Sequence, residues 1–240
     1  MHASLWRCLR EKHQTKGQSV TPEKKRARSL EEKSFRRQQI LDAASALFAE
    51  VGYEGFSVAL LASKAGIVKG TLYLYFKTRE EVFLALYDQS LNRWSEKFIQ
   101  RLPETLEDHA FCKLLYDTAF GDPLYVPLQA RLEKVIEHNV SLDCLLLSKR
   151  NFLQQVDRIA AASAEVLDIS KEQATEVIKT LGVLIVGVSG ADLAPSLDGE
   201  DIPADVQNLL SSFSSRPIFI KNAERIIRGI RAEDPNHWAQ

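Results

Sequence analysis

The stretch over residues 36–87 constrains the fold of this chain more than any other, because three short helical patterns follow one another there. The first pattern has apolar residues at i, i+4, i+7, i+8 and i+11, which places them on one stripe of an α-helix. Gly52 follows at the position where glycine commonly ends a helix. The apolar stripe consists of Ile40, Ala44, Leu47, Phe48 and Val51.

Two further helices and a tight turn are expected directly after this first helix. The second helix covers residues 57–64, and the serine that begins it is a good N-cap. Gly66 permits the left-handed backbone of a sharp turn. A third helix is expected over residues 69–76, with Leu72 and Phe76 facing inward at i and i+4. Two helices joined by so short a turn predict a helix-turn-helix over residues 57–76.

The outward residues of the third helix have the chemistry of a DNA-reading helix. Lys69 can bond to the edge of guanine, and the methyl or hydroxyl of Thr71 can meet base edges in the major groove. Gly70 permits a close approach, and the hydroxyls of Tyr73 and Tyr75 can reach phosphates, as can nearby cations. A helical hairpin with purely structural aromatics is the alternative. The predicted DNA contacts are Lys69, Gly70, Thr71, Tyr73, Tyr75, Lys77 and Arg79.

Three motifs in this stretch resemble the N-terminal DNA-binding domain of TetR-type (TetR/AcrR) repressors. They are FAEVGY at 48–53, LASKAGI at 61–67 and GTLYLYFKTREEV at 70–82. The resemblance covers about fifty residues, adds Ser57 to the DNA contacts and places Arg79 at a phosphate. Val68 and Leu60 depart from the pattern, since the family often has Ser or Ala at the first position and a polar residue at the second.

The remainder of the chain reads as a series of helices with no strand-like alternation. The long helix from Thr78 to about Gln100 belongs both to the DNA-binding unit and to the body. The predicted fold is all-α, with a three-helix reader on a larger helical bundle. The other helices are expected over residues 105–119, 124–139, 142–167, 171–193 and 216–231, and a loop is expected over residues 194–215. The predicted DNA-binding domain covers residues 34–80, and the predicted helical body covers residues 81–240.

Residues 1–33 form a basic and mainly aperiodic extension, which we expect to be flexible. Residues 1–79 carry 15 Lys and Arg against 7 Asp and Glu, whereas the rest carries 16 against 25. A basic end on an acidic body suits an anionic duplex bound at one end. Three interpretations of residues 1–33 stay open: an arm that follows DNA phosphates, an extension without a specific role, or a segment upstream of a start codon at Val20.

The resemblance also implies a dimer and a ligand pocket. In the family, the last two long helices usually form the dimer interface and the pocket lies among the central helices. We also expect Gly182, Gly187 and Gly190 to mark close helix contacts. The expected pocket residues are Phe111, Leu115, Tyr116, Phe120, Tyr125, Phe152 and Val156. The expected interface residues are Leu181, Leu184, Ile185, Gly187, Val188, Ile226, Ile227 and Ile230.

No pattern of catalytic or metal-binding residues stands out, so we expect neither an enzyme nor a cofactor. The five histidines are scattered, and Cys8, Cys112 and Cys144 have no metal-ligand spacing. The longest apolar run, residues 181–188, is too short to cross a bilayer, and the N-terminus has no apolar signal-peptide core. We therefore expect a cytoplasmic protein without a membrane partner.

The sequence predicts a homodimeric transcriptional regulator, most simply a repressor, that binds a palindromic operator in double-stranded DNA. A small, largely apolar or amphipathic effector is expected to release it. Two alternatives stay open, namely a constitutive DNA-binding protein without an effector and a regulator that senses oxidants through Cys112 or Cys144. Activation in place of repression also stays open.

Overall fold

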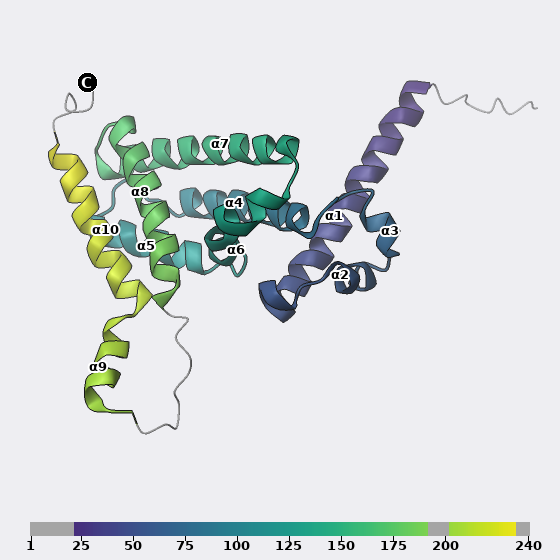
Figure 1. Cartoon of the computed structure of the whole chain (residues 1–240). Helices are drawn as coiled ribbons and strands as arrows, with labels where there is room; N and C mark the ends of the chain where they lie inside the picture. The colour runs from purple at the N-terminus through teal and green to yellow at the C-terminus, as the bar shows by residue number, and fades with distance from the viewer. Residues whose placement is uncertain (1–21, 192–201, 234–240) are drawn as a thin grey trace, which may run out of the picture. The chain divides into compact units, whose positions relative to one another are not determined.

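The computed structural model describes residues 22–191 and 202–233, in which every regular element is a helix (Figure 1). The predicted all-α class is confirmed. The chain divides into two compact units, residues 1–38 and residues 39–240. None of the helices in the described ranges is both long enough and apolar enough to span a membrane.

The first helix, α1 (Pro22–Gly55), starts earlier than the sequence indicated. We expected an aperiodic extension up to residue 33, but residues 22–33 are helical. Proline suits the first position of a helix, because its missing N–H has no intrahelical partner there. Gly52 has a φ of 65°, a left-handed value that kinks the helix end where glycine was expected to stop it.

The predicted helix-turn-helix is present, with a shorter second member than expected. Helix α2 (Val58–Lys64) is capped by the Ser57 side chain, which accepts a hydrogen bond from the backbone N–H of Leu60 at 3.2 Å. Gly66 adopts a φ of 65° in the turn. Helix α3 (Lys69–Leu72) is one turn long, and the chain continues as turns up to the buried Phe76.

The body is built around α4. This is the long helix that the sequence predicted to belong both to the DNA-binding unit and to the body. Two segments differ from expectation. The helix expected over residues 124–139 is α-helical only in its first half, and the loop expected over 194–215 contains a helix. The body consists of α4 (Arg79–Gln100), α5 (Asp108–Phe120), α6 (Tyr125–Arg131), the π-helix η1 (Leu132–Ile136), the 3-10 helix η2 (Glu137–Asn139), α7 (Leu142–Leu167), α8 (Lys171–Ser189), α9 (Ala204–Ser212) and α10 (Ser215–Ala232).

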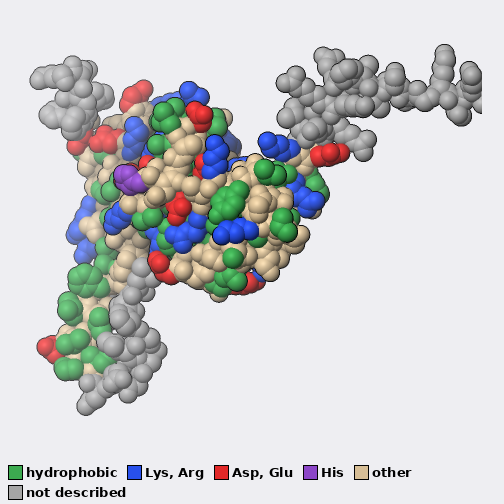
Figure 2. Space-filling model, turned by 45° about the vertical axis from the view of Figure 1, so that its right-hand side comes forward, with side chains coloured by type: hydrophobic (Ala, Val, Ile, Leu, Met, Phe, Trp, Pro, Cys, Tyr) green, Lys and Arg blue, Asp and Glu red, His purple; other side chains and the backbone are tan. Residues whose placement is uncertain are grey.

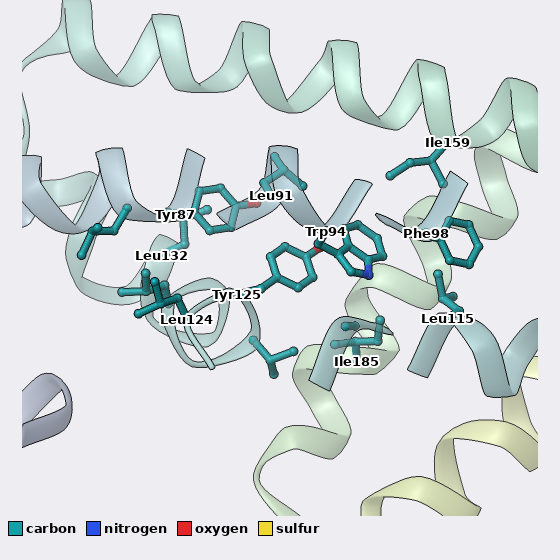
Figure 3. Close-up of a cluster of buried hydrophobic side chains, with 14 of the residues drawn as sticks. Tyr87, Leu91, Trp94, Phe98, Leu115, Leu124, Tyr125, Leu132, Ile159 and Ile185 are labelled. Carbon is teal, nitrogen blue, oxygen red and sulfur yellow. The ribbon is translucent and has the colours of Figure 1, made fainter. Parts of the chain in front are cut away.

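Helix α4 packs against α5, α6, η1 and α7, while α8 packs against α6, α7 and α10 (Figure 1). The core follows the apolar side of α4, where Tyr87, Leu91, Trp94 and Phe98 are buried and lie in a row (Figure 3). Their spacing of three and four residues keeps them on one face of the helix. Burial of this face holds the other helices around α4.

Helix α9 differs from the other body helices because its apolar side chains stay exposed. Val206, Leu209, Leu210 and Phe213 at its end are exposed by 38 to 57%. Hydrophobic side chains accordingly gather on α9 in the space-filling view (Figure 2). The many Ser and Asp residues around it concealed this short amphipathic helix in the sequence.

Candidate nucleic-acid interface and internal cavity

The predicted reading helix presents several of its expected contact residues to solvent. Lys69 and Gly70 are exposed, and Tyr73 is 43% exposed, with the Lys69 Nζ 6.0 Å from the centre of the Tyr73 ring. Thr71 and Tyr75 are half-buried. A cation and a phenol thus lie side by side on a surface that a DNA groove could meet.

The segment after the reading helix is held by its own hydrogen bonds. The backbone N–H of Lys77 donates to the Glu81 Oε2 at 2.7 Å, and the Thr78 Oγ1 accepts from the backbone N–H of Glu81 at 3.0 Å. Together with the buried side chains of Leu72 and Phe76, these bonds fix the reading helix to the start of α4. The Lys77 side chain stays exposed, as its expected role requires.

Arg79 was expected to reach a DNA phosphate, but its side chain is engaged within the protein. Its guanidinium lies 5.0 Å from the Tyr53 ring centre and 5.4 Å from that of Phe83. It also pairs with the Glu80 Oε1 at 3.1 Å and donates to the Phe56 carbonyl oxygen at 3.4 Å. The structure therefore gives Arg79 an anchoring role between the end of α1 and the start of α4.

Two exposed apolar residues on the reading surface were missed as candidates. Val68 precedes α3 and is 73% exposed, and Leu74 follows it and is 74% exposed. The sequence marked Val68 only as a departure from the family pattern. The helical period predicts Leu74 outside the buried stripe of Leu72 and Phe76, which is the signal that could have identified it. Apolar side chains of this kind can contact the thymine methyl group.

A cavity of about 390 Å³ lies within the body. Of the seven expected pocket residues, Leu115, Tyr125, Phe152 and Val156 line it. Residues from α4, α7 and α8 that were not expected at the cavity also contribute, since a helical period does not distinguish packed core from cavity wall. They include Tyr87, Leu91 and Trp94 on α4, Ile159 on α7, and Ile178, Gly182, Ile185 and Val186 on α8.

The other three expected pocket residues belong to the packed core. Phe111 is buried edge-on against Phe98, with 5.6 Å between ring centres. Tyr116 stacks on Phe120 at 4.2 Å, contacts the ring of Phe219 on α10 and shares a hydrogen bond with Ser215. Phe111 therefore packs α5 against α4, and Tyr116 packs it against α10.

Aromatic rings form one wall of the cavity. The rings of Trp94 and Tyr125 stack at 4.5 Å, and those of Tyr87 and Tyr125 at 6.2 Å (Figure 3). The Trp94 Nε1 donates to the Thr118 Oγ1 at 3.2 Å, so the indole is held in place. Burial raises the pKa of Tyr87 and of Tyr125, and both phenols therefore stay protonated.

The π-helix η1 contributes the polar side of the cavity through Glu133 and Lys134. Such π turns are rare and occur frequently at functional sites. Immediately before η1, the guanidinium of Arg131 lies 4.9 Å from the centre of the Tyr53 ring. The Thr78 Oγ1 also donates to the Asn139 carbonyl oxygen in η2 at 2.9 Å. The cavity wall and the DNA-binding unit are therefore connected through direct contacts.

Most residues expected at a dimer interface are buried inside the protomer. Leu181, Ile185 and Val188 on α8 and Ile227 and Ile230 on α10 contribute to its core, so they offer no surface to a partner. Leu184 and Ile226 are half-buried, and Gly187 is exposed. The apolar period of these helices reflects their packing inside the protomer.

The glycines of α8 do not mark close helix contacts either. A Cβ atom at Gly182, Gly187 or Gly190 would meet nothing within 4 Å. Gly182 and Gly187 border the cavity instead. Small side chains here leave space for the cavity, and the expectation of tight helix packing at these positions was wrong.

The two described cysteines differ in their surroundings. Cys112 is buried, and burial raises the pKa of its thiol to about 12, whereas Cys144 is half-buried. A thiol of such high pKa is a poor nucleophile near neutral pH. Cys8 lies outside the described residues. Among residues 22–191 and 202–233, no group of His, Cys, Asp and Glu side chains is arranged to hold a metal ion.

Two family descriptions match the chain in succession. Residues 40–86 match bacterial regulatory proteins of the tetR family, and residues 88–197 match the tetracyclin repressor-like C-terminal domain. The fatty acid metabolism regulator protein of Bacillus subtilis is 25% identical over 173 residues, which cover 70% of this chain and 76% of the relative.

Further relatives match over shorter stretches. The transcriptional repressor AcnR of Corynebacterium diphtheriae is 38% identical over 78 residues, which cover 32% of this chain and 41% of the relative. Among solved structures, the multidrug binding protein EbrR complexed with imidazole superposes with a TM-score of 0.53 at 17% identity, covering 83% of this chain and 96% of that one. This structural similarity concerns the fold.

Proposed function

Because the chain belongs to the tetR family of bacterial regulatory proteins, we propose that it is a repressor that binds a palindromic operator as a homodimer and dissociates when an effector binds. It has no catalytic role in this proposal, and it acts in the cytoplasm, where the bacterial chromosome lies. The regulatory function follows from the family. Repression, the dimer and the response to an effector are the proposed parts.

The observation that carries the proposal is the exposed pair Lys69 and Tyr73 on a reading helix that buried side chains anchor to α4. Lys69 is positioned to contact base edges in the major groove, and Tyr73 to contact a phosphate. Thr71 and Gly70 complete the surface next to the bases. Ser57 serves α2 as its N-cap, so its contribution is to orient the reading unit.

A dimer is proposed because one short helix reads too few base pairs for useful selectivity. Two-fold symmetry presents two reading helices to half-sites about 34 Å apart. Helices α8 and α10 pack against each other, and each also carries exposed side chains. On α10 these include Lys221 and Arg225, and on α8 they include Glu172 and the 75% exposed Val183. Opposite charges on neighbouring helices can pair across a self-complementary interface.

The effector is proposed to occupy the cavity beside Trp94 and Tyr125, whose walls are mainly apolar. Pockets of about 300–1,000 Å³ with few polar groups are typical of small-molecule sites. The Bacillus subtilis relative is named for fatty acid metabolism, which agrees with an effector that has an apolar body. Contacts from Arg131 at the end of α6 and from Asn139 in η2 to the DNA-binding unit provide a route by which occupancy could affect DNA binding.

Operator selection from random DNA, followed by binding measurements with the purified chain, tests this function. We expect a palindromic sequence, bound by two copies of the chain, and release by compounds that raise the melting temperature. A sequence-specific complex that no stabilising compound weakens would indicate a constitutive DNA-binding protein. Absence of any sequence preference would refute the proposed function.

A further inference from the structure

We propose that the cavity accepts an amphipathic organic anion whose apolar part carries at least one hydroxyl or amide N–H, and that Tyr87 and Gln129 recognise this polar group. The inference rests on the proposed function, because it names the ligand class of the same cavity. It goes further in assigning polar recognition inside a cavity whose walls are mainly apolar.

Tyr87 supplies the first observation. Its side chain is 1% exposed and borders the cavity, yet its hydroxyl has no hydrogen-bond partner among the described residues. A buried polar group without a partner destabilises the folded state, because it has lost its hydrogen bonds to water. The neighbouring Ser90 on α4 does not share this feature, because its hydroxyl donates to the Asp122 Oδ1 at 2.7 Å. A ligand oxygen or N–H near Tyr87 would recover the missing hydrogen bond.

Gln129 supplies the second observation from a different helix. Its Oε1 atom is buried, borders the same cavity from α6 and has no partner within the described part of the chain. A carbonyl oxygen only accepts, so a ligand must donate a hydrogen bond to it. The phenol of Tyr87 can both donate and accept. Hydroxyl and amide groups satisfy both residues, whereas a pure hydrocarbon satisfies neither.

The charged residues of the lining indicate an anionic end. Lys149 forms an ion pair with the Glu137 Oε1 at 2.6 Å, so these two charges compensate each other. The exposed Lys134 and Lys179 also border the cavity, and Glu133 is the only other acidic residue of the lining. A positive balance therefore remains at the solvent side, where a carboxylate would be stabilised while the apolar body stays among the aromatic rings.

Direct binding of chosen probes to the full-length chain tests the proposal without DNA. The probes are laurate, laurates with one hydroxyl at the chain end or in the middle, and lauryl alcohol, measured by titration calorimetry. We expect at least one hydroxylaurate to bind roughly tenfold more tightly than laurate, the effect of about one hydrogen bond. Lauryl alcohol should bind more weakly than laurate, because it lacks the anion.

Tyr87→Phe should lower the affinity for the hydroxylaurate more than the affinity for laurate, which removes the preference. Ser163→Ala is the matched control, since the Ser163 hydroxyl is also buried without a partner in the described ranges but does not border the cavity. Gln129→Met provides a second test on another helix. Loss of preference in either variant supports polar recognition, and an unchanged preference in both would overturn it.

Lys134→Ala should lower the affinity for laurate several-fold and leave the affinity for lauryl alcohol unchanged. Lys97 is an exposed lysine of α4 outside the lining, so Lys97→Ala should change neither affinity. The anion assignment is wrong if the alcohol binds as tightly as the acid or if none of the acids binds. Operator DNA does not enter these measurements. A chain that binds hydroxylaurate as expected but is not released from its operator would overturn the proposed effector control and leave this inference standing.

Discussion

The guanidinium of Arg131 lies 4.9 Å from the centre of the Tyr53 ring, which joins the last residue of α6 to the end of α1. Arg79 lies over the same ring at 5.0 Å. Arg131 also donates to the Pro127 carbonyl oxygen at 3.1 Å and directly precedes the π-helix η1, whose residues border the cavity. A shift of η1 would therefore move Arg131 and change its cation–π contact with Tyr53 in the DNA-binding unit.

Arg131→Ala should weaken the coupling between effector and operator while each ligand still binds alone. Partly buried cation–π contacts contribute about 0.5–2 kcal/mol. The factor by which the effector lowers operator affinity should therefore become roughly 2- to 30-fold smaller in this variant. Fluorescence anisotropy with labelled operator, with and without effector, measures this factor. Arg158→Ala is the control, because this exposed arginine of α7 donates to Gln155 on its own helix at 3.0 Å, and it should leave the coupling intact.

The reading helix gives a second prediction. Lys69→Ala should relax sequence preference, with a loss of about 1–3 kcal/mol at one base pair, because it removes a base contact. Lys64→Ala is the control, since the Lys64 Nζ already pairs with the Glu50 Oε1 at 2.6 Å. Binding to the selected operator and to single-base variants reports the difference. Equal discrimination by wild type and Lys69→Ala would contradict the assignment of this residue to a base.

Tyr73→Phe should weaken binding to all sequences alike, because the phenol hydroxyl is expected at a phosphate. The ring remains beside Lys69, so the surface keeps its shape. Gel shifts on the operator and on scrambled DNA should show the same loss of affinity. A loss confined to the operator would place Tyr73 at a base edge instead.

The dimer prediction concerns the exposed faces of α8 and α10. Val183→Arg should dissociate or weaken the dimer, because it adds a charge to a 75% exposed apolar position on the proposed interface. Leu153→Arg makes the same change at a 62% exposed position of α7, outside that interface, and should not affect assembly. Light scattering at micromolar concentration distinguishes the two. A monomeric wild type would refute the proposed dimer.

The thiol of Cys112 is expected to be unreactive in the folded protein. Burial raises its pKa to about 12, so it stays protonated at neutral pH and becomes a thiolate only as the pH approaches that value. Iodoacetamide followed by peptide mass spectrometry should label Cys112 only after denaturation, whereas the half-buried Cys144 should react in the native chain. Rapid labelling of native Cys112 would restore the oxidant-sensing alternative for this residue.

The ends of the helices were predictable where the backbone geometry or the cap requires a particular type of residue. Gly52 and Gly66 both have a φ of 65°, and Ser57 caps α2 as expected, because left-handed backbone and N-caps select few residues. The helices of residues 142–167 and 216–231 were predicted to within one residue. The π-helix η1 was not, since neither its apolar period nor its composition distinguishes π from α geometry.

The site was less predictable than the helices, because burial has several causes. Leu181 and Ile185 were expected at an interface between protomers, and both lie in the protomer core. Phe111 was expected in the cavity and packs on Phe98, while Tyr87 borders the cavity from α4. Apolar periodicity identifies the buried face of a helix, and only the packing of several helices determines whether that face meets core, cavity or partner.

The last prediction concerns control through α4, which contributes Trp94 to the cavity wall and begins beside the reading helix. An effector that fits only one arrangement of α4 would change the spacing of the two reading helices. A coupling of about 1–3 kcal/mol would weaken operator binding roughly 5- to 150-fold. Compounds found by thermal shift, with the hydroxylaurates as first candidates, should release operator DNA and change Trp94 fluorescence when Trp6 and Trp238 are replaced.

Thermodynamic reciprocity makes this prediction strict. If the effector weakens operator binding by a given factor, the operator must weaken effector binding by the same factor. Titration of the effector into the free chain and into the chain with saturating operator compares the two, and DNA of scrambled sequence is the control. Effector affinity that is equal with and without operator would mean that the cavity, although occupied, is not coupled to the reading helix, and DNA binding would then be constitutive.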